Sequence, residues 1–388
     1  MKKLVIVSNE SVFSGIVKCG VAEVTDSLAN ALSLDYNVFV VCPDGDGVIA
    51  KTASTFTQIS DGVRSCKFSN VTYYLIARSS WRTLVANVIN FIGPDILHNM
   101  AEPEILSMLT TRPSKVIYSF DNPKVLRGKE NLLLEYDSVT TNSKNFAKVV
   151  LENGDALSEV LTKVDFHGVP DGILDTVLAP ERGVLLPAKF SPNDMAGKQV
   201  CKERLKQTYG IQGDPYICLT MCRLIREKNI EAIIRAIPII KETGGILLVV
   251  GKGAPQYEQK LRSYKRSDGV IFMNRRASPV QAAPMTAGAD FYLQPSLMES
   301  CGLMPMTASH YGAIPIVTLN GGLADNFNDD NAIVVYKNNM ADAISKAAML
   351  YYDEEELSAK RKLCMEQDFS WKTRKLPYIE LYEKEMMQ

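Results

Sequence analysis

Two positively charged side chains stand just after an expected strand, where they could bind an anion. Arg223 follows a mostly apolar run over 217–221, and Lys228 stands where the next helix should begin. Arginine contacts phosphate as a planar fork and lysine contacts it as a point charge, so two such cations at one sheet edge suit a diphosphate. The alternative is a solvated charged loop in which these cations pair with Glu227.

A second polar stretch, from Gln294 to Leu303, follows another expected strand and should open a helix. Backbone N–H groups at the start of a helix favour an anion or a sugar hydroxyl. Glu299 lies in this stretch and can accept a hydrogen bond from a hydroxyl. The alternative is that Pro295 and Ser296 cap the helix while Glu299 is solvated.

A Gly-Gly turn, Gly321-Gly322, follows the strand expected over 314–317. Neither glycine has a Cβ, so the backbone there can come close to a ligand. The carboxyl ends of parallel strands share one sheet edge, so this turn should lie near Glu299. A ligand site made from three separate segments is therefore expected at that edge.

Strand-like and helix-like segments alternate through both halves of the chain, which predicts an α/β protein with parallel sheets. A helix is expected over 21–32, another over 143–152 with Ser143 as its cap, and a third over 229–241. The strand over 37–42 should end in a turn over 43–47. The expected strands cover 4–7, 37–42, 95–98, 115–120 and 138–141, then 217–221, 245–251, 270–273, 291–294 and 314–317.

Periodicity is lost and prolines gather between about 170 and 192, where we place a connection between two domains. A length of 388 residues, with 46% hydrophobic residues, agrees with two cores.

The net charge of −1 and the lack of long like-charge runs do not indicate a nucleic-acid binder. The eight scattered cysteines, without a C-x-x-C pair, are interpreted as reduced thiols of a cytoplasmic protein. The chain has no membrane-length apolar segment, and its N-terminal apolar run is too short for a signal peptide.

Together these segments resemble the donor domain of retaining glycosyltransferases with the GT-B fold, above all glycogen and starch synthases. The resemblance implies two Rossmann-like, doubly wound domains that face each other across a cleft. It places the acceptor-side domain at 1–185, with a C-terminal helix at 372–388 that crosses back to it, and the nucleotide-sugar domain at 186–371. The segments that carry the resemblance are Arg223-Leu224 with Lys228, Pro295-Ser296 to Leu303, Tyr311 to Pro315, and Gly321 to Asp325.

The resemblance also assigns donor-binding residues. In such enzymes the arginine and lysine hold the donor diphosphate, and the glutamate with the backbone after it holds the donor sugar. The segment from Lys18 to Glu23 resembles the lysine-glycine-glycine loop of the synthases, with Cys19 in place of a glycine. The donor-binding residues expected on this basis are Lys18, Gly20, Arg223, Lys228, Glu299, Ser300, Cys301, Gly302, Leu303, Gly321 and Gly322.

Two positions depart from the pattern of many relatives. Thr307 stands where many have a second glutamate that reaches the donor ribose, which the synthases lack as well. Asp121 stands where many have a histidine, and trehalose-phosphate synthases use an aspartate in this region. The alternative is that Asp121 only begins a turn with Asn122 and Pro123. The expected catalytic residues are Asp121, Arg223, Lys228 and Glu299.

No metal and no cofactor beyond the nucleotide sugar are expected, because no histidines or cysteines have metal-ligand spacing. The carboxylate pair Asp44 and Asp46 is interpreted as a surface turn. His98 is an acceptor-side candidate or a satisfied buried histidine. His167 and His310 are interpreted as structural.

The resemblance implies transfer of a hexose or pentose, with retention of anomeric configuration, to a hydroxyl of a glycan or small molecule. A UDP-sugar is favoured as the donor, and ADP-glucose is the other choice. A catalytically inactive nucleotide-sugar binding protein is an alternative, which the missing histidine at Asp121 supports. An epimerase on the same scaffold is a further one, which the segment from Glu299 to Leu303 disfavours.

Modified DNA is another possible acceptor, as for phage glycosyltransferases that act on a 5-hydroxymethylated base. Basic clusters in the first half could track phosphates, with Arg127 on the acceptor side. Trp81 could stack on a base. The alternative is ordinary solvated charge. The clusters are Arg78 and Arg82 around Trp81, then Arg112 and Lys115, then Lys124, Arg127 and Lys129.

Overall fold

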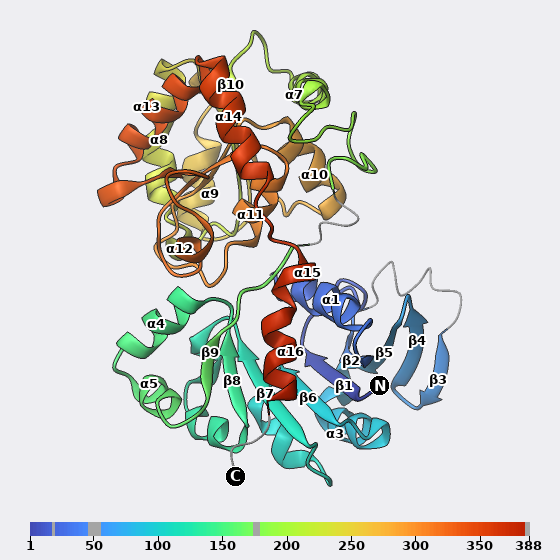
Figure 1. The fold of residues 1–388 in the computed structure, drawn as a ribbon. Helices are drawn as coiled ribbons and strands as arrows, with labels where there is room; N and C mark the ends of the chain where they lie inside the picture. Colours follow the sequence, from blue (N-terminus) through green and yellow to red (C-terminus); the bar gives the residue numbers. More distant parts are fainter. Residues whose placement is uncertain (18–19, 46–55, 174–178, 385–388) are drawn as a thin grey trace. The chain divides into compact units, whose positions relative to one another are not determined.

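The structure is a computed structural model that describes residues 1–17, 20–45, 56–173 and 179–384. It divides into two compact units (Figure 1). Unit 1 comprises Met1–Leu174 and Phe369–Gln388, and unit 2 comprises Asp175–Asp368. Each unit has a mainly or wholly parallel sheet, which confirms the predicted α/β class.

The sheet of unit 1 has the strand order β3-β4-β5-β2-β1-β6-β7-β8-β9. It is parallel from β5 to β9, but β3 and β4 form an antiparallel edge that the sequence did not predict. This edge was missed because β3 is polar and exposed throughout and lacks the apolar run that marks a buried strand. The strands are β1 Lys3–Ser8, β2 Asn37–Asp44, β3 Thr57–Ser60, β4 Val63–Phe68, β5 Val71–Ala77, β6 Ile96–Met100, β7 Lys115–Phe120, β8 Ser138–Thr141 and β9 Phe166–Gly168.

Side chains that alternate along these strands pack against helices on both faces of the sheet. Val5 and Val7 of β1 belong to a core cluster with α3, α4 and α5. The expected helices at 21–32 and 144–152 form, and the Ser143 side chain caps the second. The helices of unit 1 are α1 Val21–Leu32, α3 Trp81–Ile92, α4 Lys144–Glu152, α5 Ala156–Leu161, α15 Trp371–Arg374 and α16 Leu376–Glu383, with short 3-10 turns η1 Arg78–Ser80, η2 Pro103–Met108, η3 Pro123–Leu126 and η4 Glu130–Glu135.

The prediction of a turn over 43–47 is wrong for Pro43 and Asp44, which belong to strand β2. Strand β2 continues through Asp44, because residues 39–44 pair with β5. The Asp44 carboxylate also accepts two hydrogen bonds from Arg64 of β4, at 2.6 and 2.8 Å. Asp44 is therefore committed to an ion pair within the sheet, while Asp46 lies outside the described residues.

The sheet of unit 2 has the order β12-β11-β10-β13-β14-β15, and each of its pairings is parallel. The expected strands at 270–273, 291–294 and 314–317 form with those bounds. Its strands are β10 Tyr216–Met221, β11 Gly245–Val250, β12 Val270–Met273, β13 Phe291–Gln294, β14 Ile314–Val317 and β15 Ile333–Val334.

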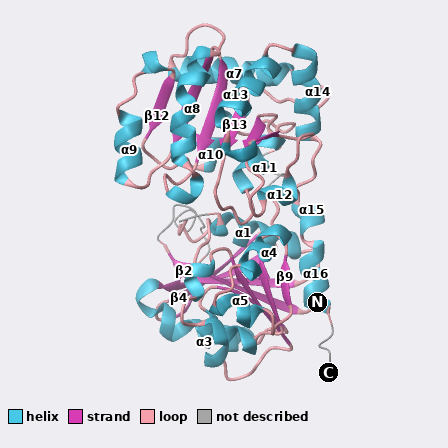
Figure 2. Ribbon diagram, turned by 90° about the vertical axis from the view of Figure 1, so that its left-hand side faces the viewer, coloured by secondary structure: helices cyan, strands magenta, loops and turns pink. Residues whose placement is uncertain are grey.

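Helices cover both faces of this second sheet (Figure 2). Cys218 of β10 packs in one core cluster, with α8, α9, α13 and α14. Its neighbours Ile217 and Leu219 pack in another, with α7, α10 and α11. The helices of unit 2 are α7 Ala196–Tyr209, α8 Ile230–Glu242, α9 Pro255–Arg262, α10 Pro279–Gly288, α11 Leu303–His310, α12 Leu323–Asn326, α13 Met340–Tyr351 and α14 Glu354–Met365, with turns η5 Arg226–Lys228, η6 Arg266–Asp268 and η7 Tyr336–Asn338.

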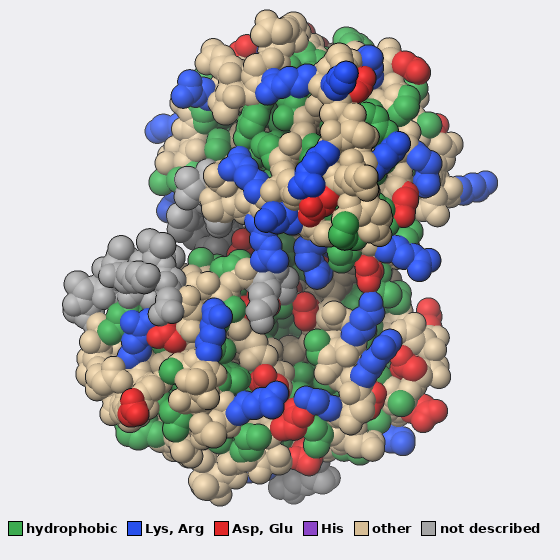
Figure 3. Space-filling view, turned by 180° about the vertical axis from the view of Figure 1, so that it is seen from behind, with side chains coloured by type: hydrophobic (Ala, Val, Ile, Leu, Met, Phe, Trp, Pro, Cys, Tyr) green, Lys and Arg blue, Asp and Glu red, His purple; other side chains and the backbone are tan. Residues whose placement is uncertain are grey.

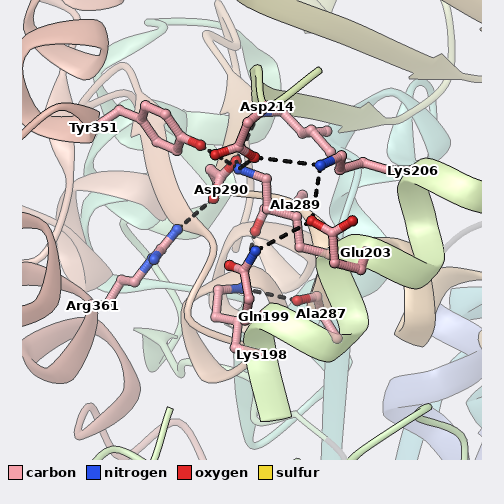
Figure 4. A network of polar contacts seen from close by, with 12 residues as sticks. Lys198, Gln199, Glu203, Lys206, Asp214, Ala287, Ala289, Asp290, Tyr351 and Arg361 are labelled. Atoms are coloured by element: carbon pink, nitrogen blue, oxygen red, sulfur yellow. Dashed lines mark hydrogen bonds and ion pairs between the residues drawn. The ribbon is translucent and has the colours of Figure 1, made fainter. Parts of the chain in front are cut away.

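A buried cation network lies at the amino end of β13 (Figure 4). Asp290 precedes this strand and accepts from Lys202 at 2.9 Å, from Arg361 at 2.5 Å and from the backbone N–H of Ile217 at 2.8 Å. Nearby, Lys198 donates to three backbone carbonyl oxygens at 2.8–3.0 Å. Helices α7 and α14 are thereby fixed to the amino edge of the sheet.

The last two helices, α15 and α16, belong to unit 1, and α14 before them belongs to unit 2. Buried side chains hold α16 to the unit 1 sheet. The Tyr382 hydroxyl is 2.7 Å from Nδ1 of His98, and the Tyr378 hydroxyl donates to Asp171 at 3.0 Å. Among the described residues, no helix is both long enough and apolar enough to span a bilayer.

Candidate functional site

The topology of unit 2 marks one position at the carboxyl edge of its sheet. Strand β10 lies between β11 and β13, so the chain leaves β10 in one direction and later returns on its other side. Loops on the two sides of such a switch point diverge, and ligands of open α/β sheets bind in the crevice between them. The loop after β10 carries Arg223 and Lys228, and the loop after β13 carries Glu299.

Lys228 and Glu299 form an ion pair at this switch point. Their side chains are only 16% and 11% exposed. The same carboxylate oxygen, Oε2, also accepts hydrogen bonds from Nε2 of Gln294 and from Oγ of Ser296, the latter at 3.2 Å. Within the described part of the chain, no residue donates to the other oxygen, Oε1. Glu299 therefore has one oxygen held by protein and one open to a ligand.

Backbone hydrogen bonds join the loops that the sequence singled out. The N–H of Leu297 donates to the carbonyl of Glu227 at 2.8 Å, which connects the loop after β13 to the loop after β10. The N–H of Gly322 donates to the carbonyl of Glu299 at 2.9 Å, which adds the Gly-Gly turn. The structure thus brings the three segments together at one edge, as the strand order requires.

Glycines in these loops serve close packing. A Cβ on Gly322 would lie 2.4 Å from the carbonyl oxygen of Ser300 and 2.5 Å from Cα of Cys301, a separation that atoms do not tolerate. Gly321 and Gly302 have φ of +57° and +96°, in the left-handed region that favours glycine. Gly322 is therefore explained by loop packing, where the sequence suggested close approach to a ligand.

The helix after β13 begins later than expected. Residues 295–302 form a loop, and α11 begins at Leu303 with Gly302 as its N-cap residue. Pro295 and Ser296 therefore do not cap it, and Glu299 is not a solvated residue. The backbone of Ser300 and Cys301 leads directly into the helix start, where unpaired N–H groups can bind a polar ligand.

Arg223 is exposed, and within the described residues no side chain pairs with its guanidinium. The loop that carries it lies against the loop after β11. Leu224 donates its N–H to the carbonyl of Lys252 at 2.9 Å, and a Cβ on Gly253 would lie 2.1 Å from the Leu224 carbonyl oxygen. The sequence interpretation missed this Gly251-Lys252-Gly253 loop. Its signal was a pair of glycines directly after a buried strand, around an exposed lysine.

Cys222 is half-buried and lies close to the charged residues of the site. Burial raises the pKa of Cys222, while the nearby positive charges of Lys228 and Arg223 oppose that rise and the charge of Glu299 adds to it. The thiol therefore stays neutral, and two of the three charges that act on it, those of Lys228 and Arg223, are positive. Such a surface favours an anion.

In unit 1, Asp121 is the first residue after β7 and is half-buried. The adjacent Asn122 caps the short turn η3, so the Asp-Asn-Pro sequence does begin a turn. Asp121 also contributes to the electrostatics of Asp171. Burial raises the pKa of Asp171 to about 7, and the negative charge of Asp121 adds to the rise. The role assigned to Asp121 stays a prediction.

Two acceptor-side candidates need correction. His98 is fully buried, and both ring nitrogens are in contact with hydroxyls, Nδ1 with Tyr382 at 2.7 Å and Nε2 with Ser119 at 2.6 Å. Trp81 is 7% exposed and packs within the unit 1 core. Neither ring is available to an acceptor, so the two aromatic side chains are structural. Arg127 is exposed.

Three members of the basic clusters of unit 1 are paired with carboxylates or buried. Arg112 pairs with Asp137 at 2.6 Å, and Lys129 pairs with Glu104 at 2.6 Å. Lys115 is buried. On the face shown in Figure 3, basic and acidic side chains alternate over unit 1. The alternative of ordinary solvated charge therefore describes this surface better.

The remaining donor candidates are in unit 1 at the start of α1. Gly20 is the residue before this helix, while Lys18 lies outside the described residues.

In the part of the chain that is described, no three histidine, cysteine or acidic side chains are grouped as metal ligands would be. None of the seven described cysteines takes part in a disulfide.

The chain is similar in sequence to known proteins. Residues 202–363 match the family described as Glycosyl transferases group 1. The chain is 31% identical over 270 residues to glycogen synthase of Lactococcus lactis, an alignment that covers 65% of this chain and 56% of that protein. It is 32% identical over 277 residues to glycogen synthase of Geotalea daltonii, covering 66% and 57%. The chain thus spans about half the length of the curated relatives it matches.

A solved structure shows the same fold. The catalytic domain of starch synthase IV from Arabidopsis thaliana, bound to ADP and acarbose, superimposes with a TM-score of 0.85 at 20% identity, covering 100% of both chains. The predicted GT-B fold and the predicted likeness to glycogen and starch synthases are confirmed. All of the candidate donor residues from Arg223 to Gly322 lie inside the segment that matches the family.

Proposed function

We propose that this chain is a retaining glycosyltransferase that moves glucose from a nucleotide diphosphate donor, ADP-glucose, to a hydroxyl of a glycan. The observation that carries the proposal is the Lys228–Glu299 pair at the switch point of unit 2, inside the segment that matches glycosyl transferases group 1. Exposed Arg223 and the open oxygen of Glu299 complete a site for a diphosphate and a sugar hydroxyl.

Each of these groups has a distinct task in such a reaction. As the bond between the sugar and the diphosphate breaks, negative charge grows on the departing phosphate. Arg223 and Lys228 stabilise that charge, and electrostatic stabilisation of this kind is the largest single source of catalysis in many enzymes. Glu299 accepts a hydrogen bond from a donor-sugar hydroxyl through Oε1 and so orients the sugar.

Retention follows from the resemblance to the synthases. The acceptor oxygen forms its bond to the anomeric carbon on the face from which the diphosphate leaves, and the acceptor proton passes to the departing phosphate. The products are the glycoside and the protonated nucleoside diphosphate. No carboxylate pair of the kind used by glycosidases is needed.

ADP-glucose replaces the UDP-sugar that the sequence favoured. The support is similarity to bacterial glycogen synthases and the fold of a starch synthase whose structure contains ADP. A DNA acceptor receives no support from the surface of unit 1, where Arg112, Lys115 and Lys129 are paired or buried.

The experiment presents ADP-glucose and UDP-glucose separately, with maltooligosaccharide, glycerol or 5-hydroxymethylated duplex DNA as acceptor. We expect release of ADP and extension of the oligosaccharide, with an α-linked product by NMR. Extension from UDP-glucose alone would change the donor, and transfer to DNA alone would change the acceptor. Binding of ADP-glucose with neither transfer nor slow hydrolysis would show an inactive binding protein.

A further inference from the structure

Strand β13 ends in Gln294, a polar residue in an apolar, buried strand. Its side chain amide donates to Oε2 of Glu299, the oxygen that Lys228 also contacts. We propose that Gln294 is a positioning residue for the glycosyl transfer: it holds Oε2 of Glu299 and thereby keeps Oε1 directed to one hydroxyl of the donor sugar. This inference rests on the proposed function.

The chemistry of the three donors to Oε2 supports this assignment. Lys228 carries a charge that the donor diphosphate will also attract, so its contact with Glu299 changes when the donor binds. Gln294 is neutral and has no such competing partner. Together with Ser296 at 3.2 Å, it continues to satisfy Oε2 while Lys228 turns to the phosphate. Glu299 then keeps its orientation through the reaction.

Burial explains why the Gln294 amide needs a hydrogen-bond partner. Gln294 is 6% exposed, and an amide buried without a hydrogen-bond partner costs free energy that an apolar side chain would not. The other residues of β13, Phe291, Tyr292 and Leu293, are apolar or aromatic and fully buried. The hydrogen bond to Glu299 satisfies this polar side chain.

The neutral ionisable groups near Glu299 do not take over the hydrogen bond that Gln294 donates. Lys228 and Arg223 come from the loop after β10 and are positively charged. Burial raises the pKa of the Cys222 thiol and that of the Tyr292 phenol, so both stay neutral near pH 7. The Cys222 thiol contacts Thr220 and the Tyr292 hydroxyl donates to the Met221 carbonyl, so neither hydrogen bond involves Glu299.

The first test replaces Gln294 by leucine and compares it with Gln199→Leu. Gln199 is a matched control, because it also donates to a glutamate, Glu203 at 3.3 Å, but on the exposed surface of α7. We expect Gln294→Leu to raise both the Kd and the KM for ADP-glucose about tenfold, the scale of one hydrogen bond to a charged group. The change in kcat should be smaller, Tm should be close to wild type, and the control should match wild type. Unchanged donor affinity in Gln294→Leu would overturn the inference.

The second test is Gln294→Glu, which keeps the shape of the side chain. At low pH its neutral carboxyl group can donate to Oε2 as the amide does. As the pH rises, the introduced carboxyl group loses its proton and can no longer donate a hydrogen bond to Oε2. The two adjacent carboxylates then repel each other. ADP-glucose affinity should therefore approach wild type at pH 5 and fall by pH 8, relative to wild type and Gln199→Leu at the same pH. A parallel pH dependence in all three proteins would contradict the positioning role.

These outcomes separate the inference from the proposed function. Wild-type protein that binds neither ADP-glucose nor UDP-glucose would remove the proposed function, and the inference with it. Wild-type protein that binds and transfers, with a Gln294→Leu variant that behaves identically, would remove only the inference. Because Gln294→Glu conserves volume, it provides the answer if Gln294→Leu does not fold.

Discussion

The two ends of strand β13 each carry a carboxylate that a lysine contacts, and they are built differently. At the amino end, both oxygens of Asp290 have partners, and its side chain is 2% exposed. At the carboxyl end, the recorded contacts of Glu299 all reach one oxygen, and the exposed Arg223 stands on the neighbouring loop. The first site is closed by protein, and the second leaves positions for a ligand.

This difference follows from the fold. At the amino edge, the cations come from helices α7 and α14, and their ion pairs with Asp290 fix these helices to the sheet. At the carboxyl edge, loops provide the cations, and loops on a rigid sheet are where binding groups concentrate. The two lysine–carboxylate contacts at the ends of this strand therefore predict different effects of mutation. Loss of the contact at the amino end should lower stability, and loss of the contact at the carboxyl end should lower activity.

The largest effect is expected from Asp290→Asn. Removing one partner of a buried ion pair leaves Lys202 and Arg361 without their counter-charge, at a cost of about 3–5 kcal/mol of unfolding free energy. Chemical denaturation should show this loss, while turnover per folded molecule at low temperature should stay near wild type. If Asp290→Asn lost turnover but not stability, the contrast between the two ends would not hold.

Alanine at the carboxyl end should have the opposite signature. Arg223→Ala, Lys228→Ala and Glu299→Ala should each lower turnover about 10²–10³-fold, the scale for loss of one positioned charge stabiliser. Their denaturation midpoints should change little in comparison with Asp290→Asn. Lys346→Ala, which breaks an exposed pair with Asp342 on α13, is the control for loss of a lysine. Near-full activity in the Arg223 and Lys228 variants would mean that the diphosphate binds elsewhere.

A buried carboxyl group at the equivalent edge of unit 1 extends the comparison to pH. Burial raises the pKa of Asp171 from 3.8 to about 7, so the folded protein holds its proton where the unfolded chain has lost it. The contribution of the neutral Asp171 to stability is complete below pH 4 and is lost as the pH rises toward about 7. Asp171→Asn should remove this decline, measured as Tm from pH 4 to 8. The two proteins should differ most in slope between pH 4 and 7, and equal slopes would assign the decline to other groups.

The smallest effect is expected from removal of divalent metal. Arg223 and Lys228 provide two positive charges at the carboxyl edge of the sheet, so the diphosphate should need no metal ion. Glucose transfer should be the same with and without EDTA, in protein first dialysed against the chelator. Loss of transfer that magnesium or manganese restores would show that Arg223 and Lys228 are insufficient.

Local pattern was enough to predict most of the elements. Strands β7, β8, β12, β13 and β14 and helix α1 have the bounds expected from apolar runs and helical spacing, because burial on one or both faces determines those residue types. The antiparallel edge at β3 and β4 and the extension of β2 through Asp44 were missed. Their stability comes from pairing with distant strands and from Arg64, neither of which leaves a local signal.

For the candidate site, the sequence by itself determined the residue types: Arg223, Lys228 and Glu299 follow strands, and parallel strands place such residues at one edge. Only the tertiary structure decided their contacts. It showed that Lys228, Gln294 and Ser296 share one oxygen of Glu299, and that His98 and Trp81 are buried. The physical reason is that a spacing fixes which edge a residue reaches, whereas burial and hydrogen-bond partners depend on side chains from elements far apart in the chain.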